Sequence, residues 1–64
     1  MTLEDQCFYA VINVRIAHER QDINEYSAVM KYCTPELPAF DIILDKIAQA
    51  EAEVMRLENL LNNL

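Results

Sequence analysis

The sequence contains no glycine, only two prolines and two cysteines, and a single histidine. Without glycine the chain cannot build a glycine-rich loop that cradles phosphate groups, which excludes the common nucleotide-binding motifs. Two cysteines and one histidine are too few for a disulfide framework or for a complete zinc tetrad within one chain. We therefore expect no bound cofactor, and none of the usual cross-links of a very small domain.

Basic residues are also scarce, because five of them stand against eleven acidic residues and give a formal net charge of −6. Binding to a nucleic-acid backbone depends on clustered lysine and arginine side chains. Direct contact with nucleic acid is therefore not expected. Proteins are the partners that this composition favours.

The chain is short for a domain that is stable by itself, with 64 residues and a mass of 7.4 kDa. A folded monomer of this size buries only about 60% of the surface that its unfolded chain exposes. Its net stability is then close to zero unless a cross-link or a partner adds to it. Because 53% of the residues are hydrophobic, we expect the additional stability to come from association with a second copy of the chain or with another protein.

The N-terminal segment has the features of neither a signal peptide nor a membrane span. Residues 1–5 carry no basic side chain, and Asn13 and Arg15 interrupt the apolar run at residues 7–16. We therefore predict a cytoplasmic protein whose cysteines remain thiols. Cys7 and Cys33 would lie about 39 Å apart along a continuous helix, which is too far for a disulfide within one chain.

Apolar residues recur at helical spacing on both sides of a single break. At this break, Pro35 and Pro38 favour extended backbone at the residues before them. The pattern predicts an all-α hairpin with a helix at 3–33, a turn at 34–37 and an antiparallel helix at 38–64. Thr2, with Asp5 three residues later, is a weakened capping box for the first helix. The predicted core seam consists of Tyr9, Ile12, Ile16, Ile23, Tyr26, Met30 and Cys33, with Glu19 as its one charged member, and of Phe40, Ile43, Ile47, Ala50, Val54, Leu57, Leu61 and Leu64.

The segment 7–16 also fits a β-strand, because its side chains alternate between two faces and several of them are β-branched. A strand followed by two helices would have to pair with its copy in a dimer, as in ribbon-helix-helix proteins. This arrangement is the alternative fold. Its outward face would offer Arg15 as the only base, which is poor for reading DNA.

A second apolar stripe follows the first half of the first predicted helix, on the side opposite to the seam. In an antiparallel hairpin it lies beside the C-terminal half of the second helix, which carries Met55 and Leu60 off the seam. Such a surface is either a docking site or the core of a homodimeric four-helix bundle, and we predict the bundle, because self-association is the most common way for a short helical hairpin to complete its core. The stripe consists of Leu3, Cys7, Ala10, Val11, Val14 and Ala17, and the predicted partner-binding residues are Leu3, Cys7, Val11, Val14, Met55 and Leu60.

Acidic residues are spaced along the second predicted helix. A row of carboxylates can imitate a phosphate backbone and occupy the groove of a nucleic-acid-binding protein. An ordinary solvated face that keeps the chain soluble is the simpler interpretation, because Lys46 and Arg56 interrupt the row. The acidic face consists of Asp41, Asp45, Glu51, Glu53 and Glu58.

His18, Asp22 and Glu25 share one helical face and could in principle ligate a metal. A solvated polar face is the more common reason for this spacing, and we predict no metal site. We also predict no enzymatic activity, since a two-helix hairpin has no pocket of its own. The sequence predicts a small acidic regulator, adaptor or chaperone that acts through an apolar helical face. The alternative is an inhibitor that mimics nucleic acid.

Overall fold

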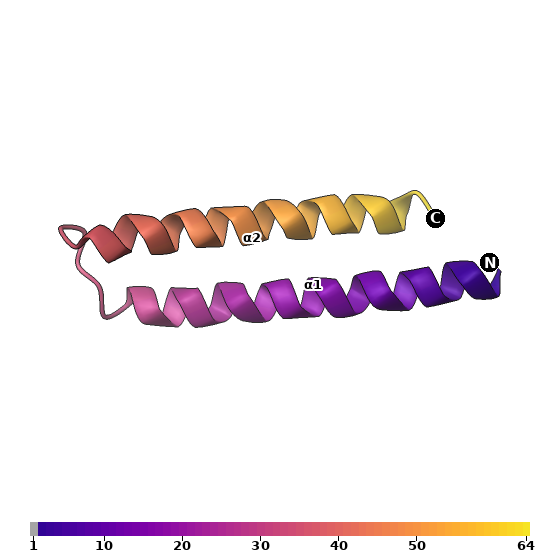
Figure 1. The fold of residues 1–64 in the computed structure, drawn as a ribbon, viewed down its shortest axis with the longest axis horizontal. Coiled ribbons are helices and arrows are strands. Elements are labelled where there is room, and N and C mark those ends of the chain that lie inside the picture. Colours follow the sequence, from indigo (N-terminus) through magenta and orange to yellow (C-terminus); the bar gives the residue numbers. More distant parts are fainter. Residues whose placement is uncertain (1) are drawn as a thin grey trace.

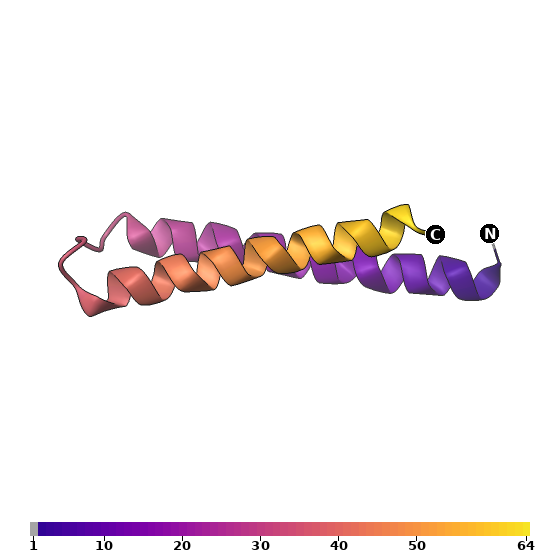
Figure 2. The ribbon, with the colours of Figure 1, turned by 90° about the horizontal axis from the view of Figure 1, so that it is seen from above.

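The computed structural model describes residues 2–64 as two long helices that pack antiparallel, α1 (Leu3–Met30) and α2 (Pro38–Asn62) (Figure 1). The helices cross at a shallow angle (Figure 2), and the Cα atoms extend over 51 × 15 × 11 Å. This confirms the predicted all-α hairpin. The strand alternative is wrong, because segment 7–16 is helical throughout and residues 2–64 contain no strand.

The start of α1 is fixed by the capping box that the sequence predicts. The Thr2 hydroxyl accepts a hydrogen bond from the backbone N–H of Asp5 at 3.1 Å, and the Asp5 carboxylate accepts one from the backbone N–H of Thr2 at 3.4 Å. Glu4 and Asp5 place negative charge in the first turn, where the helix dipole favours it. The N-terminal half of α1 is therefore held in a helical conformation from its first residue.

The helices end earlier than predicted. α1 ends at Met30 and not at residue 33, because the N–H groups of Tyr32 and Cys33 bond carbonyls three residues back, which tightens the chain before Pro35. Leu37 has the extended backbone expected before a proline, and Pro38 is the first residue of α2. α2 ends at Asn62, two residues before the predicted end.

The core is a single row of apolar side chains between the two helices, located in the half of the hairpin that holds the chain ends. Leu57 is only 1% exposed, and the seam residues toward the turn are half-buried. Two predicted members of the seam, Tyr9 and Leu64, are exposed, and Leu64 lies beyond the end of α2. Two helices alone can bury only one layer of side chains between them. Most of the remaining apolar surface is therefore in contact with solvent. The buried residues are Ile12, Ile16, Ala50, Val54 and Leu57, and the half-buried residues packed on their cluster are Ile23, Leu60 and Leu61.

Candidate docking surface

The second stripe lies on the solvent side of α1, opposite to Ile12 and Ile16. The side chains of Leu3, Val11 and Val14 are 76%, 60% and 55% exposed, and all six residues of the stripe are exposed. The placement follows from helical geometry, since side chains three, four and seven positions apart share a face. The N-terminal half of α1 is therefore apolar on both sides, and α2 covers only one of them.

A shallow, open depression is present on this side of α1. It is lined by Ala10, Val11, Val14, Arg15 and His18. Ala10, Val11 and Val14 form its apolar part, and the basic Arg15 and the imidazole of His18 line it toward the middle of the helix. A hollow of this kind accepts an apolar side chain from another protein, with a polar contact at one edge.

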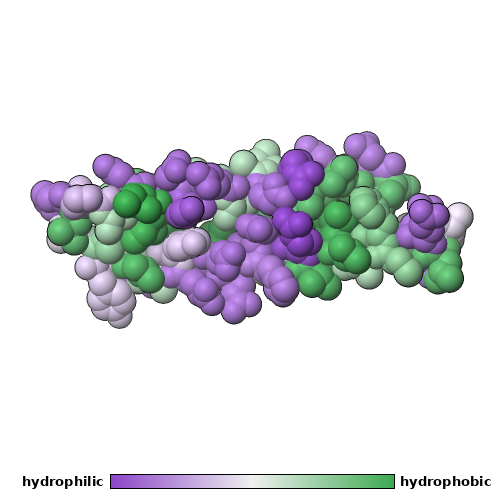
Figure 3. Space-filling model, in the orientation of Figure 1, coloured by the Kyte–Doolittle hydropathy of each residue, from purple (hydrophilic) through white to green (hydrophobic). Residues whose placement is uncertain are grey.

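The two residues predicted on α2 behave differently from each other. Met55 is 66% exposed, but Leu60 is half-buried and packs against the core cluster. The prediction that Leu60 lies off the seam is therefore wrong: this side chain helps to close the hairpin. On the face seen in Figure 3, hydrophobic residues gather at the end that holds the chain termini and again near the turn, with hydrophilic residues between them.

A second group of exposed apolar side chains surrounds the turn, and it was not predicted. Tyr32 is 89% exposed and Ile42 is 60% exposed. The residues after Pro38 form a nearly continuous apolar run, and this run could have indicated an exposed apolar group near the turn. The other members of the group are Val29, Leu37 and Leu44.

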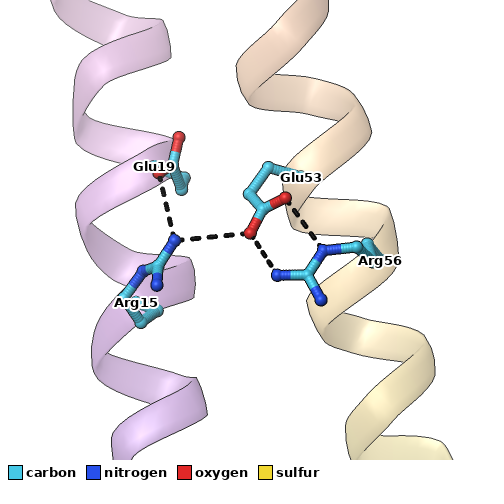
Figure 4. Close-up of polar contacts among 4 residues, drawn as sticks. All are labelled: Arg15, Glu19, Glu53 and Arg56. Carbon is cyan, nitrogen blue, oxygen red and sulfur yellow. Dashed lines mark hydrogen bonds and ion pairs between the residues drawn. The ribbon is translucent and has the colours of Figure 1, made fainter.

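Ion pairs link the two helices halfway along the hairpin. Arg15 lies 3.3 Å from Glu53 across the interface and 4.0 Å from Glu19 on its own helix. Glu53 also accepts hydrogen bonds from Arg56 (Figure 4). This cluster was not predicted from the sequence, although Arg15 and Glu53 each directly precede a buried seam residue, where opposite charges on paired helices meet.

Glu53 titrates differently from an ordinary glutamate. The hydrogen bonds from Arg56 lower the pKa of its carboxyl below the ordinary value of 4.5, against the opposing effect of desolvation, and the charges of Arg56 and Arg15 lower it further. The same contact raises the pKa of Arg56. Glu53 is therefore held as the carboxylate anion between two guanidinium groups.

A further ion pair joins Arg20 to Glu58. Five residues correspond to about 140° of rotation around a helix. Arg15 and Arg20 are five residues apart, as are Glu53 and Glu58, so the two interhelical pairs lie on opposite sides of the core row. Each flat face of the hairpin thus carries an ion pair near its centre.

The predicted acidic face is not one free row of carboxylates. Glu53 and Glu58 are half-buried and paired with arginines, whereas Asp41, Asp45 and Glu51 are exposed. Asp45 also accepts a hydrogen bond from Gln49. The face therefore divides into a neutralised part beside α1 and an anionic part on the outer side of α2.

His18, Asp22 and Glu25 on α1 are all exposed to solvent. The Glu25 carboxylate accepts a hydrogen bond from the side chain of Gln21. Over residues 2–64, no three side chains of histidine, cysteine, aspartate or glutamate come together in a group that could hold a metal ion.

No protein-family model matches the chain, and neither a curated protein nor a solved structure matches it significantly. Neither α1 nor α2 has a stretch that is long and apolar enough to cross a bilayer, within the part of the chain that the structure describes.

Proposed function

We propose that this chain is a small, non-enzymatic protein-interaction module that binds its partner through the second stripe of α1. The observation that carries the proposal is the exposure of Leu3, Val11 and Val14 along one uninterrupted helical face. Contiguous exposed apolar surface on a small protein is typical of an interaction site. A regulator, adaptor or chaperone that acts in the cytoplasm fits this surface best.

A second candidate function is inhibition by mimicry of nucleic acid. It is favoured by the exposed carboxylates of Asp41, Asp45 and Glu51 on the outer side of α2. The carboxylates of Asp41 and Asp45 are four positions apart and repel each other, and a basic partner would relieve this repulsion. The pairing of Glu53 and Glu58 with arginines leaves this candidate fewer free charges than the sequence suggested.

Affinity capture from a lysate of cells that carry the gene separates the two functions. The baits are the wild-type chain, Val11→Asp and the matched control Ile42→Asp, whose wild-type side chain is also 60% exposed but lies near the turn. A partner of the second stripe is retained by wild type and by Ile42→Asp at high salt, and is lost with Val11→Asp, because apolar contacts are insensitive to ionic strength.

A partner of the acidic surface shows the opposite pattern. It is retained by Val11→Asp and is released by salt or by Asp45→Lys, since interactions between exposed charges are screened. Capture that is the same for wild type and Val11→Asp contradicts the proposed function.

A further inference from the structure

The hairpin exposes more surface than a compact protein of its mass. Its accessible surface is 4,890 Å², whereas a folded monomer of 7.4 kDa exposes about 4,200 Å². The excess is about 700 Å² per chain, or about 1,400 Å² for two chains. Stable protein–protein interfaces bury about 1,200–2,000 Å² in total, so pairing of two copies would remove the amount of surface that a stable dimer needs to bury.

The flat faces of the hairpin are poorly suited to this pairing. A four-helix bundle stacks two hairpins face to face, and the stacked faces become the core. One face carries the cluster of Arg15 and Glu53, and the other carries the pair of Arg20 and Glu58. Burying either pair incurs a desolvation penalty that can exceed the attraction between the charges. The second stripe on the edge of α1 carries no charged residue.

The charges around the second stripe determine the orientation of the second copy. Glu4 borders the stripe near its start, and Arg15 and His18 border it on the same side near its end. A parallel copy, related by a twofold axis along the helices, would leave the two Glu4 side chains on opposite flanks of the contact, about 16 Å or more along the helices from Arg15 and His18. An antiparallel copy, related by a twofold axis near Ala10, places Glu4 within about one turn of Arg15 and His18 of the second copy. Opposite charges then meet at both ends of the interface.

The length of the stripe agrees with the antiparallel arrangement. Beyond Ala17 the same side of α1 continues with the polar Gln21 and Glu25. With the twofold axis near Ala10, these residues extend past the start of the second copy's α1 at Leu3 and remain in water. A parallel copy would bring the two Glu25 carboxylates together inside the contact, which is unfavourable.

We infer that the second stripe of α1 is covered by a second copy of the same chain, with the two α1 helices antiparallel, edge to edge, about a twofold axis near Ala10. This inference rests on the proposed function, since it uses the same surface and names its occupant. The two hairpins extend in opposite directions from the contact, and the turns lie at the far ends of the dimer.

Sedimentation equilibrium over a wide range of dilution, under reducing conditions, tests the self-association. We expect a reversible dimer for the wild-type chain and for Ile42→Asp. Val14→Asp should weaken the dimer by about thirtyfold or more, because two unpaired carboxylates would be buried in the contact. A monomeric wild-type chain, or a dimer that Val14→Asp leaves unchanged, overturns the inference.

Disulfide trapping in a Cys33→Ser background tests the relative orientation of the two α1 helices. The substitutions used are small and introduce no charge into the second stripe. With the axis near Ala10, Cys7 and its copy are offset by about 9 Å along the helices, beyond the reach of a disulfide. Cysteine placed at the axis by Ala10→Cys, combined with Cys7→Ser, should form a cross-linked dimer on mild oxidation, and Cys7 should not. Cross-linking through Cys7, which parallel copies would hold at the same level, overturns the inference, and so does the absence of a cross-link in the Ala10→Cys variant.

Failure of the inference and failure of the proposed function give different results. A monomer whose captured partner is lost with Val11→Asp disproves pairing with a second copy and retains the stripe as a docking site. A dimer that forms through the flat faces, combined with capture that does not depend on the stripe, disproves both.

Discussion

Glu53 is the only carboxylate in residues 2–64 that pairs with arginines from both helices. Its lowered pKa means that the folded chain binds a proton at this site less readily than the unfolded chain does. Ionised Glu53 therefore stabilises the fold above the ordinary pKa of 4.5, and this contribution is lost as the pH falls through the lowered folded value.

Glu53→Gln should lower the melting temperature at neutral pH, because a neutral amide cannot hold both guanidinium groups. The difference from wild type should shrink as the pH falls below 4.5, and thermal melts followed by circular dichroism would measure it. Glu51→Gln, which removes an exposed carboxylate outside the ion pairs of the described chain, is the control and should show no such trend. A Glu53→Gln effect that is the same at every pH contradicts this role.

At the scale of the helix, α2 holds the hairpin together through one row of side chains. Leu57→Ala should destabilise the fold by about 2–4 kcal/mol, through lost burial and the cavity left behind. In so small a domain this is most of the stability, so urea or thermal unfolding should show a largely melted chain. Met55→Ala removes a side chain of similar size that is 66% exposed, and it should change stability by less than about 0.5 kcal/mol. Equal effects would place the core elsewhere.

The helices and their core could be predicted from the sequence because heptad spacing and two prolines leave few other solutions. The buried residues Ile12, Ile16, Ala50, Val54 and Leu57 were all predicted. The end of α1 at Met30 and the position of Leu60 could not be predicted, since hydrogen bonds in the turn and the rotation of α2 against α1 decide them. The interhelical ion pairs depend on how far long side chains reach along the interface, which spacing alone does not specify.

At the scale of the whole molecule, the proposed edge-to-edge dimer would differ from a four-helix bundle in its length. Each hairpin extends over 51 Å, and the contact covers the first half of α1, about 21 Å at 1.5 Å per residue. The dimer should therefore extend over about 80 Å, whereas two hairpins stacked face to face would be little longer than one. Small-angle X-ray scattering measures this maximum dimension directly. A dimer close to the length of one hairpin would contradict the edge-to-edge arrangement.

The exposed side chain of Tyr32 lies at the turn of the hairpin. The proposed dimer would display two identical turns, at opposite ends of a rod about 80 Å long. A molecule that binds one turn weakly is held more firmly when it carries two such binding sites at a matching separation, because the second contact forms at a high effective concentration. The hairpin dimer would then act as a divalent spacer, which selects its targets by the distance between their binding sites.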